Sequence, residues 1–375
     1  MNARVVSLTG PTEGLSLRSR APSTVRRSVS DRSTLDVLIT GASGFIGRHL
    51  AARYLGEDLR VGLLVRRPSA VEDLRDLGAT VVGTSLFDTQ ALMESVRGCR
   101  TVIHLAAMTS ALSRNDLFAV NGQGTRNLAQ ACRAQSRPPH LIYVSSVAAA
   151  GPCAAGSVRT EIDAPAPVSN YGRSKLAGEL AVAEIADEVP TTIVRPGIVF
   201  GPGNREMLPM FQAIKYLRFH PVVGWRGPQL SMSYIDDTVE SITQAAEYGT
   251  RLPREQMPAE KRLTSGRGVY FACCPEYPDY AELGKIIRVH LKRPWAPVVP
   301  LVGPAPWIAA GINQIIAYCR RRPDAFNIDK VREATASSWA CSCERIEAEF
   351  GLHPSRSLAD AIQETVAWYK HQRWL

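Results

Sequence analysis

Tyr171 and Lys175 stand four residues apart in a segment with a helical pattern. That spacing places both side chains on one face of the helix, one turn apart. A phenol has an ordinary pKa of about 10, and a nearby ammonium lowers it by stabilising the phenolate. The pair therefore suits proton transfer at a substrate oxygen while hydride moves to or from a nicotinamide. Lys175 is also positioned to hold the nicotinamide ribose.

A tyrosine and a lysine at this spacing are common on helix surfaces, but the preceding strand favours a chemical role. The apolar run 141–144 ends in Ser145 and Ser146, ahead of Tyr171 in the chain. Substrates of open α/β sheets bind beyond the carboxyl ends of the strands, where these hydroxyls stand. A hydroxyl followed by the Tyr/Lys pair predicts a proton-transfer site.

Three glycines indicate a second site. Within Leu35–Leu50 an apolar strand is followed by Gly41, Gly44 and Gly47 and then by a predicted helix. In such a unit one glycine permits a sharp turn, one lets the backbone approach a pyrophosphate, and one lets the helix pack closely on the strand. The helix N-terminus favours phosphate. The segment therefore predicts dinucleotide binding.

Alternating strands and helices must position these residues. Apolar strands are predicted at 37–39, 60–67, 80–82, 101–107, 141–145 and 191–195, and helices at 48–55, 71–77, 90–96, 115–135 and 170–188. This alternation implies parallel pairing with helices on both faces. Right-handed crossovers then give an α/β fold with a Rossmann-type doubly wound sheet.

The chain divides into three predicted parts. Residues 1–34 are rich in Ser, Arg, Thr and Pro, and we expect a disordered basic tail. Residues 35–195 are expected to form the NAD(P)-binding Rossmann domain. From 196 to 375 the alternation breaks, which predicts a smaller α+β substrate lobe with some segments returning to the sheet. Its candidate elements are helices at 238–248, 280–291 and 358–372 and a strand at 268–272.

Composition narrows the function classes. The net charge of +9 lies partly in the tail, where six arginines face only Glu13 and Asp31, and no nucleic-acid-binding motif accompanies it. The eight cysteines lack the spacing of metal ligands, so we expect no metal site and a reduced, cytoplasmic setting. The N-terminus has no apolar signal core. We expect a small-molecule substrate, no nucleic acid, and an oligomeric state left open, with a homodimer as one expectation.

The stretch 298–319 is notably apolar and is followed by Arg320, Arg321 and Arg322. Prolines interrupt it, which leaves a helix too short to span a bilayer. We expect a helix that covers the substrate cavity. Contact of this helix with a membrane surface is the less favoured alternative.

The motifs together resemble the extended branch of the short-chain dehydrogenase/reductase superfamily, the NAD-dependent epimerase/dehydratase family, from about Leu35 to the C-terminus. The matching segments are 40–47, 104–107, 120–125, 144–146, 171–175, 195–203, 234–237 and 367–369. The pattern is most similar to the 3β-hydroxysteroid dehydrogenase and dihydroflavonol reductase groups. Their substrates are apolar alcohols or ketones, and the apolar stretch 298–319 agrees with such a cavity.

The resemblance implies a role for individual residues. Ser146 would be the catalytic hydroxyl, Tyr171 the acid/base and Lys175 its partner. The implied cofactor-binding residues are Gly41, Ser43, Gly44, Phe45, Ile46, Gly47, Arg66, Arg67, Leu86, Leu105, Ala106, Ala107, Asn121, Tyr171, Lys175, Pro196 and Val199.

Other positions of the pattern have structural interpretations. His104 is expected to pack beneath the cofactor and Arg195 to form an ion pair. Asp236 and Asp237 are expected to cap a helix. Ser85 departs from the family, which has an aspartate there in contact with adenine.

The end of the second strand bears on cofactor choice. NAD-selective enzymes place a carboxylate there to bind the ribose 2′-hydroxyl, whereas this chain has Arg66 and Arg67 and no acid before Glu72. Arginine suits a 2′-phosphate. We expect a preference for NADP(H), with NAD(H) as the alternative.

Two substitutions bear on the reaction. Dehydratases of this branch carry an Asp-Glu pair where this chain has Val147 and Ala148, and sugar-nucleotide epimerases carry an asparagine where it has Ile198. The sequence favours an oxidoreductase acting on a hydrophobic secondary alcohol or ketone. A nucleotide-sugar epimerase is the first alternative, and a non-catalytic NADP-sensing regulator is the second.

Overall fold

A computed structural model describes residues 35–57, 59–324 and 326–375. The predicted disordered tail, residues 1–34, lies outside these residues. The division predicted at 195/196 stays a prediction.

Among the described residues, seven strands form one parallel sheet, in the order β10-β6-β5-β4-β1-β2-β3. They are β1 (Val37–Thr40), β2 (Val61–Val65), β3 (Thr80–Gly83), β4 (Thr101–His104), β5 (His140–Val144), β6 (Thr191–Pro196) and β10 (Val269–Ala272). The predicted doubly wound sheet is confirmed. Strand order reverses between β1 and β4, and in such sheets ligands bind at this reversal, beyond the carboxyl ends of the strands.

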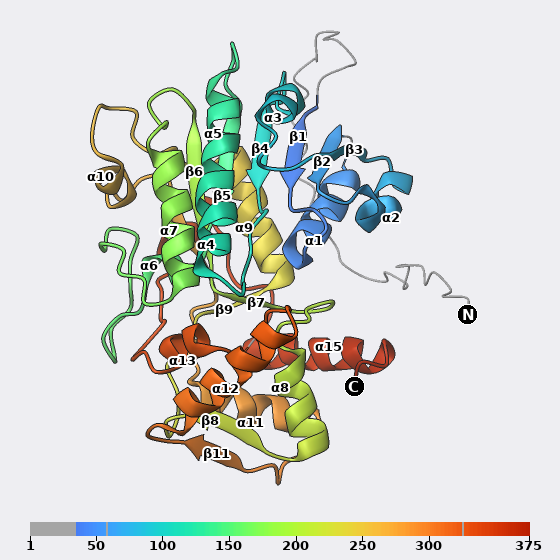
Figure 1. Cartoon of the computed structure of the whole chain (residues 1–375), viewed down its shortest axis with the longest axis vertical. Helices are drawn as coiled ribbons and strands as arrows, with labels where there is room; N and C mark the ends of the chain where they lie inside the picture. Colours follow the sequence, from blue (N-terminus) through green and yellow to red (C-terminus); the bar gives the residue numbers. More distant parts are fainter. Residues whose placement is uncertain (1–34, 58, 325) are drawn as a thin grey trace. The chain divides into compact units, whose positions relative to one another are not determined.

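Helices cover both faces of this sheet (Figure 1). They are α1 (Phe45–Leu55), α2 (Glu72–Asp76), α3 (Thr89–Ser95), α5 (Thr125–Arg133), α7 (Asn170–Ala183) and α9 (Ile235–Glu247). Successive strand residues point to opposite faces, so Leu38 packs in one core with α3, α5 and α7. Its neighbour Ile39 packs in the other core with α1, α2 and α9. The central strands are apolar at nearly every position because both faces are buried.

The predicted helix 115–135 is wrong in one respect. The structure divides it into α4 (Arg114–Phe118), a π-helical turn at Ala119–Gly124, and α5. The turn places Asn121, whose amide donates to the Met108 carbonyl (2.9 Å) and accepts from the Met108 N–H (2.8 Å). These bonds to a distant segment stabilise a wider turn that helix propensity alone does not predict.

The C-terminal lobe lies at the carboxyl ends of the sheet strands (Figure 1). Its elements are β7 (Ile198–Phe200), α8 (Leu208–Gln212), β8 (His220–Val223), β9 (Met232–Tyr234), α11 (Tyr280–His290), β11 (Val298–Leu301), α12 (Ala305–Cys319), α13 (Ile328–Ala334) and α15 (Leu358–His371). Two further helices of this half of the chain pack on the sheet domain: α10 (Ala259–Leu263) on α7 (Figure 1) and α14 (Glu344–Phe350) on β10. Strand β11 pairs with β8, and β7 pairs with β9. Helix α9 packs on β5 and β6, and strand β10 joins the sheet beside β6.

The expectation that α12 covers the substrate cavity stays a prediction. The helix buries Pro306, Ala310 and Ala317 and leaves most of its other side chains exposed. The buried strip of α12 is narrow because α13 is the main helix that packs against it.

Candidate active site

Tyr171 lies in the first turn of α7. The Ser169 hydroxyl caps this helix by accepting the N–H of Gly172 at 2.9 Å. A Cβ on Gly172 would lie 2.3 Å from the Ala148 carbonyl oxygen, so the glycine lets α7 pack against α6 (Val147–Ala150). This contact places Tyr171 beside the carboxyl end of β5, as the sequence predicted.

Ser146 is the serine that meets Tyr171. Its hydroxyl lies near enough to the Tyr171 phenol to lower the pKa of that phenol, and it accepts the N–H of Ala148 at 3.1 Å, at the start of α6. The neighbouring Ser145 hydroxyl is buried and has no hydrogen-bond partner among the described residues. The structure therefore brings together Ser146 and Tyr171, and it leaves Ser145 outside the pair.

Burial dominates the electrostatics of the phenol. It raises the pKa of Tyr171 to about 12, and Glu206 acts in the same direction. The Lys330 ammonium and the Ser146 hydroxyl lower that pKa without outweighing burial. Tyr171 is therefore a protonated phenol at neutral pH and can donate a proton.

Lys175 does not act on the phenol as expected. Its Nζ donates to the Val144 carbonyl at 2.9 Å and lies 4.4 Å from the centroid of the Tyr143 ring. Burial lowers the pKa of Lys175 to about 7, against the opposing attraction of Glu179. The predicted lowering of the tyrosine pKa by Lys175 is absent because burial shifts both groups toward their neutral forms.

The C-terminal lobe adds charged neighbours that the sequence reasoning missed. The Lys330 Nζ lies 5.8 Å from the centroid of the Tyr171 ring, and Asp329 accepts the N–H and the side-chain amide of Asn170 (2.8 and 3.1 Å). No spacing in the sequence links these residues to α7. A local hint is Asn327, which caps α13 and so marks a helix start there.

The glycine turn has the close contacts expected of a dinucleotide site. Gly41 has φ +74°, and a Cβ there would lie 2.6 Å from the Ala106 nitrogen. A Cβ on Gly47 would lie 2.3 Å from the Gly41 oxygen. Helix α1 has no side-chain cap and no acidic residue in its first turn, so its N-terminal N–H groups remain for an anion. This turn, held against the segment after β4 at the strand-order reversal, fits a dinucleotide phosphate.

The predicted cofactor residues lie around this edge with different exposures. The exposed ones are Ser43, Gly44, Arg66, Arg67 and Ala107. The partly buried ones are Gly41, Phe45, Ile46, Leu105, Ala106, Tyr171 and Val199. The buried ones are Gly47, Leu86, Asn121, Lys175 and Pro196. The Asn121 amide also donates to the Ser174 hydroxyl at 2.9 Å. These hydrogen bonds of Asn121 join the segment after β4 to α7, so the residue positions these two segments.

The two arginines after β2 differ from Arg48, the nearby cation of the glycine turn. Arg66 and Arg67 form no side-chain ion pair or hydrogen bond with any described residue. Arg48 donates to the Ala70 carbonyl at 2.9 Å and pairs with Asp73. The Arg48 guanidinium is thus bound to α2 and the turn before it, whereas the guanidinium groups of Arg66 and Arg67 are available to bind a ligand.

The remaining positions of the motif have structural partners. His104 is buried between the hydroxyls of Thr40 (2.6 Å) and Thr125 (3.0 Å), and burial lowers its pKa to about 3, so it packs as a neutral ring. Arg195 and Glu179 form a fully buried ion pair at 2.7 Å, as predicted.

The capping prediction for Asp236 and Asp237 comes out differently, and Ser85 has a partner within its own turn. Asp236 and Asp237 lie inside the first turn of α9, and Tyr234 occupies the N-cap. Asp237 accepts the N–H of Ser355 at 3.1 Å, so it joins α9 to the C-terminal lobe and does not cap the helix. The Ser85 hydroxyl accepts the N–H of Phe87 at 3.3 Å, within its own turn.

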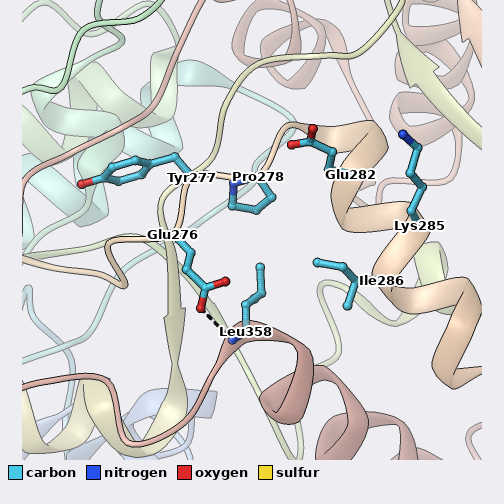
Figure 2. Close-up of a pocket in the computed structure, with 7 residues that line it drawn as sticks. All are labelled: Glu276, Tyr277, Pro278, Glu282, Lys285, Ile286 and Leu358. Atoms are coloured by element: carbon cyan, nitrogen blue, oxygen red, sulfur yellow. Dashed lines mark hydrogen bonds between the residues drawn. The ribbon is translucent and has the colours of Figure 1, made fainter.

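A surface pocket of about 480 Å³ lies elsewhere in the lobe, between α11 and α15 (Figure 2). Figure 2 shows Glu276 bonded to the backbone nitrogen of Leu358, at 3.0 Å. Glu282 completes the capping box of α11. These carboxylates stabilise helix starts, and none of Ser146, Tyr171 and Lys175 lines the pocket.

Comparisons with known proteins show the family of this chain. Residues 37–256 match the sequence model of the NAD dependent epimerase/dehydratase family. "Ceramide reductase" of Caulobacter vibrioides is 28% identical, over 90% of this chain and 96% of the relative. "Sterol demethylase protein B" of Methylococcus capsulatus is 30% identical, over 90% of this chain and 99% of the relative.

Solved structures agree with the fold. "MoeE5 in complex with UDP-glucose and NAD" superposes with a TM-score of 0.69 and 19% identity, over 90% of this chain and 99% of that chain. DesIV of Streptomyces venezuelae, a dTDP-glucose 4,6-dehydratase with NAD and TYD bound, gives a TM-score of 0.70 and 20% identity, over 90% and 97%. At this identity the likeness shows the fold alone.

Proposed function

Because the chain belongs to the NAD dependent epimerase/dehydratase family, we propose that it reduces a ketone of a hydrophobic substrate to a secondary alcohol with NADPH. The observation that carries the proposal is the Ser146 hydroxyl beside a protonated Tyr171 at the carboxyl edge of the sheet. A protonated phenol is the form that a reduction consumes.

Ser146, Tyr171 and Lys175 have separate roles in the proposed reduction. The Ser146 hydroxyl orients the substrate oxygen toward Tyr171, and Tyr171 gives its proton to that oxygen, which becomes the hydroxyl of the product. When bound beside this edge, a nicotinamide would supply the hydride. Lys175, anchored on the Val144 carbonyl, would hold its ribose next to the phenol. Positioning of this kind accounts for a large part of catalysis.

The cofactor choice rests on the end of β2. Arg66 and Arg67 are exposed there, and no carboxylate precedes Glu72. A planar guanidinium matches a phosphate in shape and charge. These features support NADP(H); the NAD bound in the two solved structures belongs to proteins that share only the fold.

The substrate class rests on relatives matched along nearly their whole length. One is named a ceramide reductase and another a sterol demethylase protein, so both names refer to lipids. The apolar α6 segment after Ser146 lacks the acid pair that the sequence comparison associates with elimination. We therefore favour a lipid-like ketone over a sugar nucleotide.

The test is NADPH oxidation, followed at 340 nm, with a long-chain ketone, a 3-ketosteroid and UDP-glucose, each also run with Tyr171→Phe. We expect turnover of a lipid ketone that is lost in the variant. Isomerisation of the sugar nucleotide without net NADPH oxidation would instead establish the epimerase. NADPH binding with no conversion of any compound would favour the regulator.

A further inference from the structure

Helix α12 presents an apolar face that no described residue covers. Ile308, Ile312 and Ile315 are 59%, 56% and 67% exposed. Their i, i+4, i+7 spacing places them on one side of the helix. Trp307 and Ile316 are exposed beside them. We refer to these five residues as the α12 apolar face.

The surroundings extend this face. A shallow pocket of about 490 Å³ lies along it, lined by Ala309, Ile312, Asn313, Ile316, Asp324 and Phe326. Near the start of α12, the Gly224 N–H donates to the Leu301 carbonyl at 2.9 Å, and the next residues are Trp225 and Val302. Both side chains are exposed, Trp225 by 76%. The exposed apolar side chains of α12 and the pocket along them indicate an interaction site.

Positive charge lies at the C-terminal end of the face. Arg320, Arg321 and Arg322 directly follow α12, and all three are exposed. Their side chains form no ion pair or hydrogen bond with the described residues. No charged side chain interrupts the helix itself. An uncharged apolar helix followed by unpaired guanidinium groups fits a partner that has both a hydrocarbon region and anionic groups.

We propose that the α12 apolar face lies in the interface of an anionic lipid bilayer, with Arg320 and Arg322 against lipid phosphates. A second copy of the chain would bring more positive charge, whereas a bilayer supplies the complementary phosphates. At 15 residues the helix is about 22 Å long, so it lies on a membrane and does not cross it. None of the described helices is long and apolar enough to be a membrane span.

The position of α12 connects such a surface to the candidate active site. Helix α12 packs on α13, and α13 carries Lys330, which faces the Tyr171 ring. A protein docked through α12 would thus hold its site close to the lipids, where a hydrophobic ketone resides. This consequence rests on the proposed function, while the docking itself does not.

The test is flotation of the full chain with vesicles of phosphatidylcholine alone or with phosphatidylglycerol. We expect binding to the anionic vesicles that weakens with salt. Ile312→Glu with Ile315→Glu should lower the partition coefficient at least tenfold. Arg320→Gln with Arg322→Gln should also lower it at least tenfold. Arg321 is left unchanged because its φ is +51°, so a substitution there could also change the stability of the backbone turn.

The matched control is Leu77→Glu with Phe87→Glu, which charges two exposed apolar side chains near the other edge of the sheet. This variant should bind vesicles like the unaltered protein. Absence of binding to either vesicle, or equal loss in the control, would overturn the proposal. So would a change from dimer to monomer in the isoleucine variant with unchanged flotation, because the face would then join two copies. Flotation without ketone reduction contradicts only the proposed function, and reduction without flotation contradicts only the docking.

Discussion

The ammonium of Lys330 faces the ring of Tyr171 at 5.8 Å, from a helix of the other lobe. Burial opposes the charge on Lys330, but the Glu333 carboxylate, 2.9 Å away, helps keep its pKa above the ordinary value. A charged lysine next to the phenol lowers the pKa of Tyr171. The lobe thus adds a charge beside the phenol, whereas the sequence pattern pointed to α7 alone.

Replacing Lys330 with Met should raise the pKa of Tyr171. In the oxidation direction Tyr171 acts as the phenolate, so at a fixed pH below its pKa the rate should fall tenfold for each unit of that rise. The measurement is kcat/KM for alcohol oxidation between pH 8 and 10. Lys330→Arg should retain the profile. An unchanged profile in Lys330→Met would show that the lysine does not act on the phenol.

Tyr171→Phe should reduce kcat by roughly 10²- to 10⁴-fold, because it removes the proton donor. NADPH affinity should change little, since the glycine turn is untouched. Steady-state rates and a binding titration test both points. Retention of more than about a tenth of the original kcat would exclude Tyr171 as the acid.

Lys175 should make stability depend on pH. Its pKa is about 7 in the folded chain against an ordinary 10.5, so between these values the unfolded chain binds more protons. The free energy of unfolding should therefore rise with pH across that window, through this group. Urea unfolding from pH 7 to 9.5 should show a smaller rise for Lys175→Met. The exposed Lys285→Met is the control, and equal slopes in the two variants would contradict the prediction.

Arg66→Ala with Arg67→Ala should weaken NADPH binding at least tenfold and NADH binding hardly at all. Charge-assisted bonds to the 2′-phosphate are lost, although exposure reduces what each contributes. Calorimetric titration with both cofactors measures this, and Arg75→Ala on α2 is the matched control. Equal losses for the two cofactors would indicate general damage to the site.

Glu179→Gln should destabilise the fold by about 3–5 kcal/mol, because it leaves the buried Arg195 charge without its partner. Both side chains are fully buried. The exposed Arg126–Glu184 pair supplies the control, and Glu184→Gln should cost at most about 1 kcal/mol. Denaturant unfolding compares the two. Similar losses in the free energy of unfolding would show that the buried pair stabilises the fold no more than the exposed pair does.

Local patterns determined much of this protein. Apolar runs of strand length, separated by helical periods, predicted six of the sheet strands, because burial on both faces of the central strands leaves a signal within each of those segments. The glycine turn and the Tyr171–Lys175 spacing were equally local. Each needs only a few neighbouring residues, and the structure places them at one sheet edge.

Contacts between distant segments were decided by the tertiary structure. Lys330 reaches Tyr171, Asp237 binds the backbone of Ser355, and Asn121 widens a helix by bonding Met108. The exposure of α12 belongs here too: its apolar composition was visible in the sequence, but which side chains face solvent depends on how little packs against it. Periodicity carries no information about such partners, because they meet only after the chain has folded.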